Sequence, residues 1–397
     1  MPRRSRINWP LNIGIVCFFG AMAIYIAWPM IGFFMGWEVA ETDSFGLPPD
    51  PGAIARDRAM TLLAGSWFFV LGASIGSFLN VVAYRMPMGL TFVSKPSRCP
   101  FCETPILAQH NVPILGWLTL RGRCNACRLP ISSRYIFVEI AVGTLFLTLF
   151  LAEIASGGQS LPIREPNSRT GVMWNLFTPQ YDLIGIYAYH AFLLAILATV
   201  SLMKLDRFRV PRRFAFFTLA MGVALRWVWP ELSVLPMPDW LADSLSSWLE
   251  TLPLLDRFVR VLLDLAIGGV LGWIVQLAIA FAAGRRLSPS RDVSMFVVSL
   301  IAVYCGWQAV VPVLLIASFV QLLFTLFGRA SGGDASWLWG MAYLAGAWLT
   351  LCFWRQLPSV WFPGAETPLQ YQLVAIALGL AAVAIAAAIQ PARTREL

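Results

Sequence analysis

The chain is a succession of long apolar segments separated by short polar ones. Apolar runs of about 20 residues, long enough to cross roughly 30 Å of hydrocarbon, recur throughout it. In lipid, backbone amides must be bonded within a helix or a closed barrel, and these runs do not alternate as barrel strands do. We therefore predict an all-α polytopic membrane protein. Its ten helices are expected at residues 11–35, 61–84, 135–155, 181–203, 213–229, 258–283, 293–309, 311–328, 337–356 and 370–390, with Pro312 alone separating the seventh from the eighth.

Composition and charge exclude other classes of protein. Of 397 residues, 58% are apolar and only 13% are charged, whereas about a quarter of a soluble domain is charged. This balance excludes an ordinary soluble enzyme, a disordered chain and a small disulfide-stapled domain. The net charge of +8 would otherwise suggest nucleic acid, but basic cytoplasmic loops account for it, so we expect no nucleic-acid partner. We find no internal repeat in the sequence.

The positions of Lys and Arg predict the orientation in the membrane. Basic residues concentrate on the cytoplasmic side of membrane proteins, and counting the predicted spans places all the basic clusters on one side. The clusters are Arg3, Arg4 and Arg6; Arg121, Arg123, Arg128 and Arg134; Lys204, Arg207, Arg209, Arg212 and Arg213; Arg285, Arg286 and Arg291; and Arg393 and Arg395. We therefore expect both termini to be cytoplasmic.

The longest polar insert contains four cysteines in two close pairs. Cys99 and Cys102 form one C-x2-C motif, and Cys124 and Cys127 form another after 21 intervening residues. Four thiolates on two turns supply the tetrahedral sulfur shell that Zn²⁺ prefers, and the metal would stabilise a domain too small for a large core. We predict a structural four-cysteine site of the zinc-ribbon kind, with reduced, metal-free cysteines as the alternative. A redox site is disfavoured, and His110 is expected to be a loop residue rather than a ligand.

Several ordered motifs around this insert resemble those of bacterial type IV prepilin peptidases. Residues 76–87 read GSFLNVVAYRMP, and the same kind of segment precedes a cytoplasmic four-cysteine insert in that family. Residues 111–117 read NVPILGW, residues 121–124 read RGRC, and residues 134–139 read RYIFVE. The agreement is specific over residues 72–142 and continues more faintly toward residue 350.

The resemblance implies a membrane aspartic protease of the bacterial inner membrane. Such enzymes cleave the leader of pilin-like or type II secretion pseudopilin precursors at the cytoplasmic face. Many also methylate the new N-terminus with S-adenosylmethionine, so this cofactor is implied by the resemblance only, and its binding residues are unknown. Two Asp residues at cytoplasmic helix ends carry the hydrolysis, because general acid–base chemistry needs carboxylates close enough to share a proton. The zinc of a closed four-cysteine site would be structural.

The resemblance assigns one catalytic carboxylate to Asp292. Gly306, Trp307 and Gln308 follow it at about the family's spacing, as does a later proline. Its immediate neighbours differ from the family's pattern, because Arg291 stands in place of a glycine and Ser294 in place of a lysine.

The other catalytic position departs from the family. Aligned on Pro211, residues 202–211 place Lys204 where the catalytic Asp belongs and Asp206 two residues later. Two helical residues rotate a side chain by about 200°, so Asp206 can reach the site only if the helix has unwound after Lys204. Lys204 beside Asp292 would instead form an ion pair and break the dyad.

These residues leave three hypotheses open. The first is an active peptidase that uses Asp292 and Asp206. The second is a catalytically silent relative that serves as a binding or assembly module for pilin-like or secretion partners. The third is a methyltransferase without protease activity, which no separate motif tests. Whether the chain is an enzyme therefore stays open at this point.

Other polar residues in apolar surroundings receive simpler interpretations. Asp334 is expected to be a solvated loop residue and Asp264 an interfacial residue at the start of its helix. Glu139 is a functional candidate by its depth, although pairing with Arg134 or snorkelling explains it equally well. His190 is expected to be a packed core residue rather than a ligand. Cys17, Cys305 and Cys352 are expected to be apolar packing residues.

We divide the chain into five parts. Residues 1–60 hold a helix and loop outside the resemblance, and residues 61–84 are the helix that ends in the GSFLN motif. Residues 85–134 are the cytoplasmic four-cysteine domain. Residues 135–356 form the peptidase-like bundle, and residues 357–397 hold a last helix and a basic tail.

Overall fold

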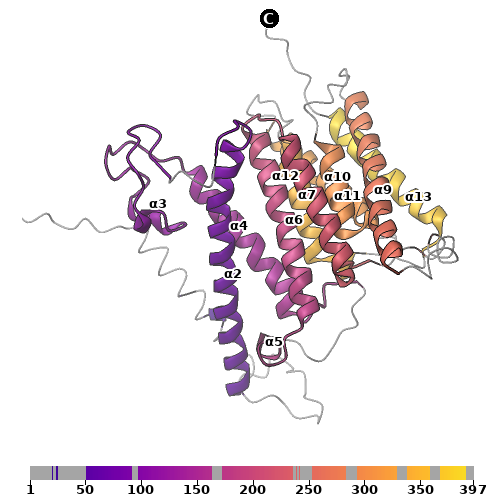
Figure 1. The fold of residues 1–397 in the computed structure, drawn as a ribbon, viewed down its shortest axis with the longest axis horizontal. Helices are drawn as coiled ribbons and strands as arrows, with labels where there is room; N and C mark the ends of the chain where they lie inside the picture. Colours follow the sequence, from indigo (N-terminus) through magenta and orange to yellow (C-terminus); the bar gives the residue numbers. More distant parts are fainter. Residues whose placement is uncertain are drawn as a thin grey trace, which may run out of the picture. The chain divides into compact units, whose positions relative to one another are not determined.

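The structure is a computed structural model in which most of the chain is helical (Figure 1). It describes residues 20, 24–25, 51–91, 97–162, 172–235, 238, 241, 253–282, 293–328, 338–357 and 367–389. Within these ranges, the pairing of extended backbone segments consists of two isolated β-bridges. The chain folds into two compact units, which are described separately below. Unit 1 comprises Met1–Phe78, Val93–Leu151 and Ser168–Pro179, and unit 2 comprises Leu79–Phe92, Ala152–Asn167 and Gln180–Leu397.

Unit 1 is built on two long helices that approach each other closely. Its helices are α2 (Pro51–Arg85, which continues into unit 2), η1 (Ala108–His110), α3 (Leu115–Thr119), α4 (Arg134–Phe150) and α5 (Val172–Phe177). Gly72 and Gly76 of α2 face α4, and a Cβ atom on Gly72 would lie 2.8 Å from the Val142 carbonyl oxygen. A Cβ atom on Gly76 would lie 3.1 Å from the Val138 carbonyl oxygen. The glycine of the GSFLN motif thus permits close packing of two membrane helices, as in other G-x3-G pairs.

Unit 2 is a bundle of apolar helices. Its elements are the π-helix η2 (Leu151–Ala155), α6 (Tyr181–Leu205), α7 (Arg212–Val228), η3 (Pro230–Leu232), α9 (Pro253–Ala282), α10 (Ser294–Cys305), η4 (Trp307–Ala309), α11 (Val310–Gly328), α12 (Leu338–Cys352), η7 (Trp354–Gln356) and α13 (Leu369–Ala388). Ten of the twelve residues of α10 are buried, and α10 packs against α9, α7 and α6 (Figure 1). A helix that is apolar all round belongs in the core, so α10 is the centre of this bundle.

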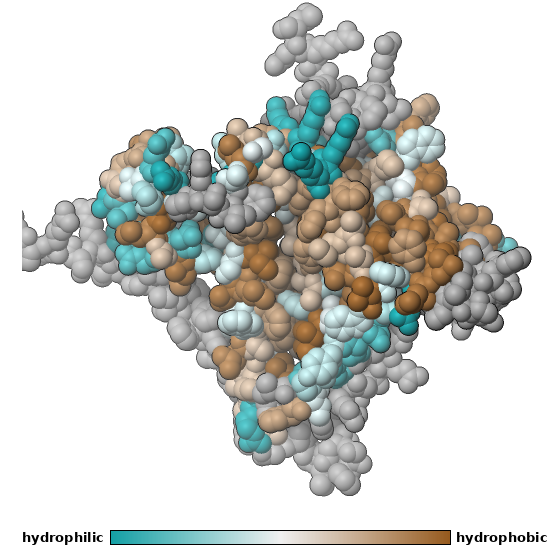
Figure 2. Space-filling view, viewed as in Figure 1, coloured by the Kyte–Doolittle hydropathy of each residue, from teal (hydrophilic) through white to brown (hydrophobic). Residues whose placement is uncertain are grey.

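The helices fit a membrane protein. Six helices in the described ranges are long and apolar enough to cross a membrane, and α10 and α12 are shorter apolar helices. The six are Gly52–Arg85, Arg134–Ala155, Tyr181–Leu205, Leu254–Ala282, Trp307–Leu326 and Leu369–Ala388. Over α6, α7 and α9 the middle of the visible face is mainly hydrophobic, and hydrophilic residues gather above and below it (Figure 2). The all-α polytopic fold is therefore confirmed.

Most predicted spans coincide with helices to within a few residues, but the break between the seventh and eighth was assigned wrongly. The break lies at Gly306, whose φ of +91° is a conformation that glycine adopts readily, and not at Pro312. The short helix η4 follows, and α11 begins at Val310. Pro312 is tolerated because it stands in the first turn of α11, where its missing N–H leaves no bond unmade. The predicted span 11–35 lies almost wholly outside the described residues.

The contact between α9 and α10 depends on two glycines one turn apart. A Cβ atom on Gly268 would lie 2.4 Å from Ala302 Cβ, and one on Gly272 would lie 2.7 Å from Met295 Cα. Gly269, on the same helix, has room, because its Cβ atom would lie 3.8 Å from Ser299 Oγ. The central helix α10 therefore sits directly on a glycine surface of α9.

We predict that Gly272→Ala lowers the melting temperature of the purified protein in detergent, because the added methyl group would meet the Met295 backbone. Gly269→Ala is the matched control. It is expected to leave the melting temperature unchanged or raise it slightly, since Ala is favoured over Gly in a helix by about 0.5–1 kcal/mol. Equal losses from the two variants would contradict the close approach of α9 and α10.

Candidate functional site

The four cysteines of unit 1 lie on two turns that share one geometry. In the first turn, the Cys99 N–H donates to the Thr104 carbonyl oxygen at 3.1 Å, and Glu103 has a φ of +54°. In the second, the Cys124 N–H donates to the Leu129 carbonyl oxygen at 2.9 Å, and Arg128 has a φ of +62°. Each turn therefore reverses the chain directly after its second cysteine.

Each turn is closed by an antiparallel bridge, between Arg98 and Pro105 in one and between Arg123 and Pro130 in the other. The two segments share the pattern R-C-x2-C-x2-P. The prediction that the sequence contains no internal repeat was therefore wrong, because this eight-residue pattern occurs twice, at residues 98–105 and 123–130. The two copies of this repeat are short and far apart in the sequence. The distance between them is the length of the intervening insert, so it does not follow the period of a helix or a strand.

The four sulfur atoms form a cluster of the size that a tetrahedral metal requires. Cys99 Sγ lies 3.8 Å from Cys127 Sγ, and Cys102 Sγ lies 3.9 Å from Cys124 Sγ. All four sulfurs lie within 4.8 Å of one another. A Zn–S distance of about 2.3 Å places the sulfurs of a regular tetrahedron about 3.8 Å apart. The cluster thus fits Zn²⁺, and four sulfur ligands leave no coordination position for a substrate.

Hydrogen bonds within the turns favour the thiolate form of two cysteines. The hydroxyl and backbone of Thr104 lower the pKa of Cys102 to about 6, and the backbone amides of Cys127 and Ala126 lower the pKa of Cys124. The Leu129 amide also lowers the pKa of Cys127, but burial and the three neighbouring cysteines raise it to about 11. Since the thiolate is the metal ligand, the turns prepare two of the four ligands directly.

Glu139 connects the cysteine domain to α4. Its side chain is buried, and its Oε2 atom accepts a 2.6 Å hydrogen bond from the backbone N–H of Ile114, which has a φ of +64°. This contact gives Glu139 an anchoring role, which was not among the interpretations drawn from the sequence. Nearby, a Cβ atom on Gly116 would lie 2.2 Å from the His110 carbonyl oxygen, so the NVPILGW motif folds tightly. His110 does not belong to the cysteine cluster.

In unit 2, helix α6 ends directly before Asp206. The Phe208 N–H donates to the Met203 carbonyl oxygen at 2.8 Å, and the Arg207 N–H donates to the Lys204 carbonyl oxygen at 2.9 Å. Together with the φ of +60° at Arg207, these bonds form a Schellman motif. Asp206 is the C-cap residue, with φ −83° and ψ 5°. The helix therefore ends one residue after Lys204, while the Asp206 N–H still donates to the Leu202 carbonyl oxygen at 3.1 Å as in the last helical turn.

Helix α12 brings the end of α6 and the start of α10 together. The Ser201 hydroxyl, one turn before the end of α6, shares its one proton between the Gly340 carbonyl oxygen at 2.8 Å and the Leu197 carbonyl oxygen of its own helix at 2.7 Å. Tyr343, one turn later on α12, donates from its hydroxyl to Ser294 Oγ at 3.1 Å. Ser294 is the first residue of α10, so both helix ends lie at the same end of the bundle.

Asp292 itself lies outside the described residues, as do Arg291 and Asp334. It precedes the N-cap residue of α10, Val293, by one position. Val293 and Ser294, at the described start of α10, lie at the same end of the bundle as Asp206. Tyr84, at the end of the GSFLN segment, also approaches this end, with its ring 6.2 Å from that of Phe208.

Comparison with known proteins agrees with the motifs. Residues 70–152 match the model of the bacterial peptidase A24 N-terminal domain. Over 260 residues the chain is 28% identical to a prepilin leader peptidase/N-methyltransferase of Myxococcus xanthus (strain DK1622). It is 43% identical over 91 residues to the protein of the same name in Klebsiella pneumoniae, and 26% identical over 301 residues to that of Pectobacterium carotovorum subsp. carotovorum.

The chain is similar to the prepilin leader peptidases. The domain that matches the family model contains both the cysteine cluster and Glu139. The three matches cover 64%, 21% and 68% of this chain. They cover 59%, 40% and 87% of the respective relatives. No solved structure matches the chain.

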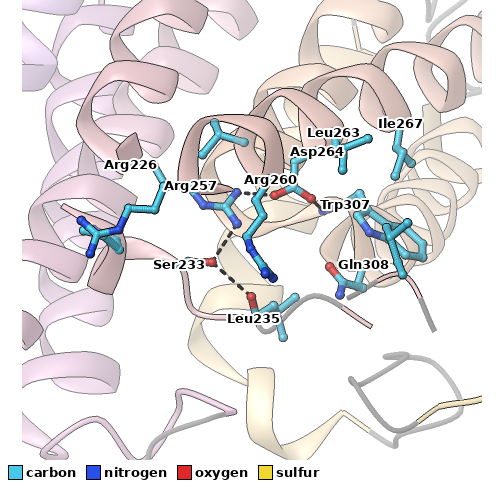
Figure 3. A pocket seen from close by; sticks show the side chains of 13 residues that line it. Arg226, Ser233, Leu235, Arg257, Arg260, Leu263, Asp264, Ile267, Trp307 and Gln308 are labelled. Atoms are coloured by element: carbon cyan, nitrogen blue, oxygen red, sulfur yellow. Dashed lines mark hydrogen bonds and ion pairs between the residues drawn. The ribbon is translucent and has the colours of Figure 1, made fainter. Parts of the chain in front are cut away.

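A buried ion pair lies at the other end of the bundle. Arg226 Nη1 of α7 lies 2.6 Å from Asp264 Oδ2 of α9, and Arg226 Nη2 donates to Ser233 Oγ at 2.7 Å (Figure 3). The backbone N–H of Trp307 donates to Asp264 Oδ1 at 3.3 Å. The prediction that Asp264 stands at a helix start was wrong, because α9 begins eleven residues earlier, at Pro253. Asp264 is also buried, with 7% of its surface exposed.

A second buried pair joins His190 to Glu153. His190 Nδ1 lies 2.6 Å from Glu153 Oε1, and both side chains are fully buried. The prediction that His190 packs in the core is confirmed. Its partner was not singled out from the sequence, because Glu153 stands only two residues before the end of the predicted span 135–155, where an acidic residue is common. Glu153 stands in the π-helix η2.

We predict that the purified chain contains about one zinc ion per molecule, measured by elemental mass spectrometry. Exchange of two ligands, Cys99→Ser with Cys124→Ser, is expected to abolish the zinc content, because two sulfurs do not form a closed site. Cys352→Ser is the matched control and should retain the metal. Freshly purified, reduced wild-type protein without zinc would contradict the assignment.

We predict that Asp264→Ala lowers the stability of the bundle strongly, because it leaves the Arg226 guanidinium buried without its counter-ion. Breaking a buried pair on one side typically costs about 3–5 kcal/mol. The double variant Arg226→Met with Asp264→Leu should lose less than the sum of the single losses. Asp256→Ala, which breaks the more exposed pair with Arg260, is the control and should cost under about 1 kcal/mol. Additive losses in the melting temperature would contradict the coupling.

Proposed function

We propose that the chain is a prepilin peptidase-like membrane aspartic endopeptidase. Its substrates would be type IV pilin-like or type II secretion pseudopilin precursors, whose leaders it would remove at the cytoplasmic face of a bacterial inner membrane. Asp206 and Asp292 are the proposed catalytic pair. The observation that carries the proposal is the end of α6 directly before Asp206, at the same end of the bundle as the start of α10.

The described ends of α6 and α10 lie at one end of the bundle. The Asp206 N–H still donates to the Leu202 carbonyl oxygen at 3.1 Å, as in a helix, so the Asp206 side chain leaves α6 about 200° around the axis from that of Lys204. The hydrogen bonds of α12 to Ser201 and Ser294 hold the two helix ends in register.

In the proposed reaction, the two carboxyl groups share one proton. The deprotonated group accepts a proton from water as the water oxygen attacks the carbonyl carbon of the scissile bond. The protonated group donates its proton to the leaving amide nitrogen, and the C–N bond breaks. The zinc proposed for the cysteine cluster has no part in these steps, because four sulfur ligands complete its coordination. S-adenosylmethionine stays a prediction from the resemblance, to which no residue is assigned.

A second candidate function is that of a silent family member that binds pilin-like or secretion partners. Two positions favour it. Lys204 takes the place of the family's catalytic Asp, and Ser294 takes the place of a family lysine. Ser294 is 1% exposed and hydrogen-bonded to Tyr343, so this position has been rebuilt as a packing site. A long cationic side chain does not fit there without a change in α12.

The experiment is a cleavage assay in detergent with a generic pilin precursor. Wild-type protein is expected to cleave it, and Asp206→Ala and Asp292→Ala are each expected to lower the rate at least about a hundredfold, the usual contribution of a general acid or base. Asp334→Ala is the matched carboxylate control and should retain activity.

Two outcomes would decide against the proposal. Inactive wild-type protein that gains activity in Lys204→Asp would show a silenced family member and support the binding function. Wild-type cleavage that survives Asp206→Ala but not Asp292→Ala would show that another group completes the pair. Circular dichroism and melting temperatures of all variants separate loss of chemistry from loss of fold.

A further inference from the structure

A small cavity opens beside the Arg226–Asp264 pair, at the end of the bundle away from Asp206 (Figure 3). Its volume is about 80 Å³. Since one water molecule needs about 10–15 Å³ by the same measure, the cavity has room for roughly five non-hydrogen atoms. Three arginines line it, Arg226 from α7 and Arg257 and Arg260 from α9. The cavity therefore has the size of a phosphate group and a lining rich in donors.

Positive charge predominates around this cavity. Among the described residues that line the cavity, Asp264 is the one that carries a carboxylate. One of its oxygens pairs with Arg226, and the other accepts a hydrogen bond from the Trp307 N–H. Arg260 Nε pairs with both oxygens of Asp256, each at 2.8 Å. Arg257 is exposed and makes no hydrogen bond or ion pair with any described residue. One guanidinium group at the cavity is thus left without a counter-ion in the described part of the chain.

The cavity lies at the level of a membrane surface. Arg257 is three residues into the candidate span Leu254–Ala282. Beside it, the indole N–H of Trp227 donates to the Leu254 carbonyl oxygen at 3.1 Å, and the Trp227 and Phe258 rings meet edge to face at 6.1 Å. Exposed Trp side chains are enriched where lipid headgroups begin. Phosphate groups of lipids occupy the same level.

We propose that this cavity binds a phosphate ester group, with Arg257 as its main ligand. A guanidinium group matches the paired oxygens of a phosphate, and such charge-assisted hydrogen bonds are stronger than neutral ones. Lipid headgroups and soluble phosphate share this chemistry, and the membrane level of the cavity favours the headgroup of an anionic phospholipid. The site is independent of the proposed peptidase function, since it lies at the opposite end of the bundle.

The test uses the full-length protein in detergent and native mass spectrometry. Phosphatidylglycerol and inorganic phosphate are titrated separately. Wild-type protein is expected to retain one phosphatidylglycerol molecule, and Arg257→Gln is expected to weaken this binding about tenfold. Asp256→Ala should strengthen binding, because it releases Arg260 from its carboxylate partner. Arg257→Lys keeps the positive charge but loses the paired N–H donors. Its affinity for phosphatidylglycerol should lie between those of wild type and Arg257→Gln.

The matched control is Arg213→Gln, which removes the same charge from an exposed position on the other end of α7 and should leave binding unchanged. Inorganic phosphate binding that is weakened by Arg257→Gln, with no effect on the lipid, would support the phosphate site and assign it to a soluble ligand. Equal effects of Arg213→Gln and Arg257→Gln, or no effect of either on both probes, would overturn the proposal. Asp256→Ala binding no tighter than wild type would overturn the part assigned to Arg260.

Discussion

Two hydrogen bonds to α12 determine how the ends of α6 and α10 meet. The Ser201 hydroxyl binds the Gly340 carbonyl oxygen, and the Tyr343 hydroxyl binds Ser294 Oγ, all in buried surroundings. In a low-dielectric core, such polar contacts fix register because an unmade bond is costly. Gly340 permits this approach, since a Cβ atom there would lie 3.1 Å from Ser201 Cα. The proposed catalytic end of the bundle depends on this register.

The polar chemistry of unit 2 is divided between the two ends of the bundle. Val303, which accepts a hydrogen bond from buried Arg226, lies nine residues beyond Ser294 on α10, or about 13 Å along the helix. His190 lies fifteen residues before the end of α6, or about 22 Å. The buried ion pairs therefore stabilise one end, while the carboxyl groups proposed for catalysis stand at the other. The cysteine cluster of unit 1 adds a closed structural centre with its own fold.

The helices and the cysteine cluster could be predicted from the sequence, because membrane helices and metal-binding turns depend on local sequence patterns. Apolar length predicted the helices, and C-x2-C spacing predicted the cluster that Cys99 and Cys124 begin. What failed depended on contacts between distant residues. The burial of Asp264 follows from Arg226 on another helix, and Glu153 gains its role only through His190. The break at Gly306 failed for a different reason, since proline is a stronger sequence signal than glycine but is harmless in a first helical turn.

The central claim is that Asp206 and Asp292 lie within reach of each other, and cross-linking tests it most directly. A variant with Asp206→Cys and Asp292→Cys would be oxidised in membranes, and the linked peptides identified by mass spectrometry. A disulfide requires Cα atoms about 4.4–6.8 Å apart. The account predicts a disulfide in this pair and none in the control pair Asp206→Cys with Glu231→Cys, because Glu231 lies in η3, beside the other end of α6. Linkage of the first pair only by reagents longer than about 10 Å, well beyond that range, would contradict it.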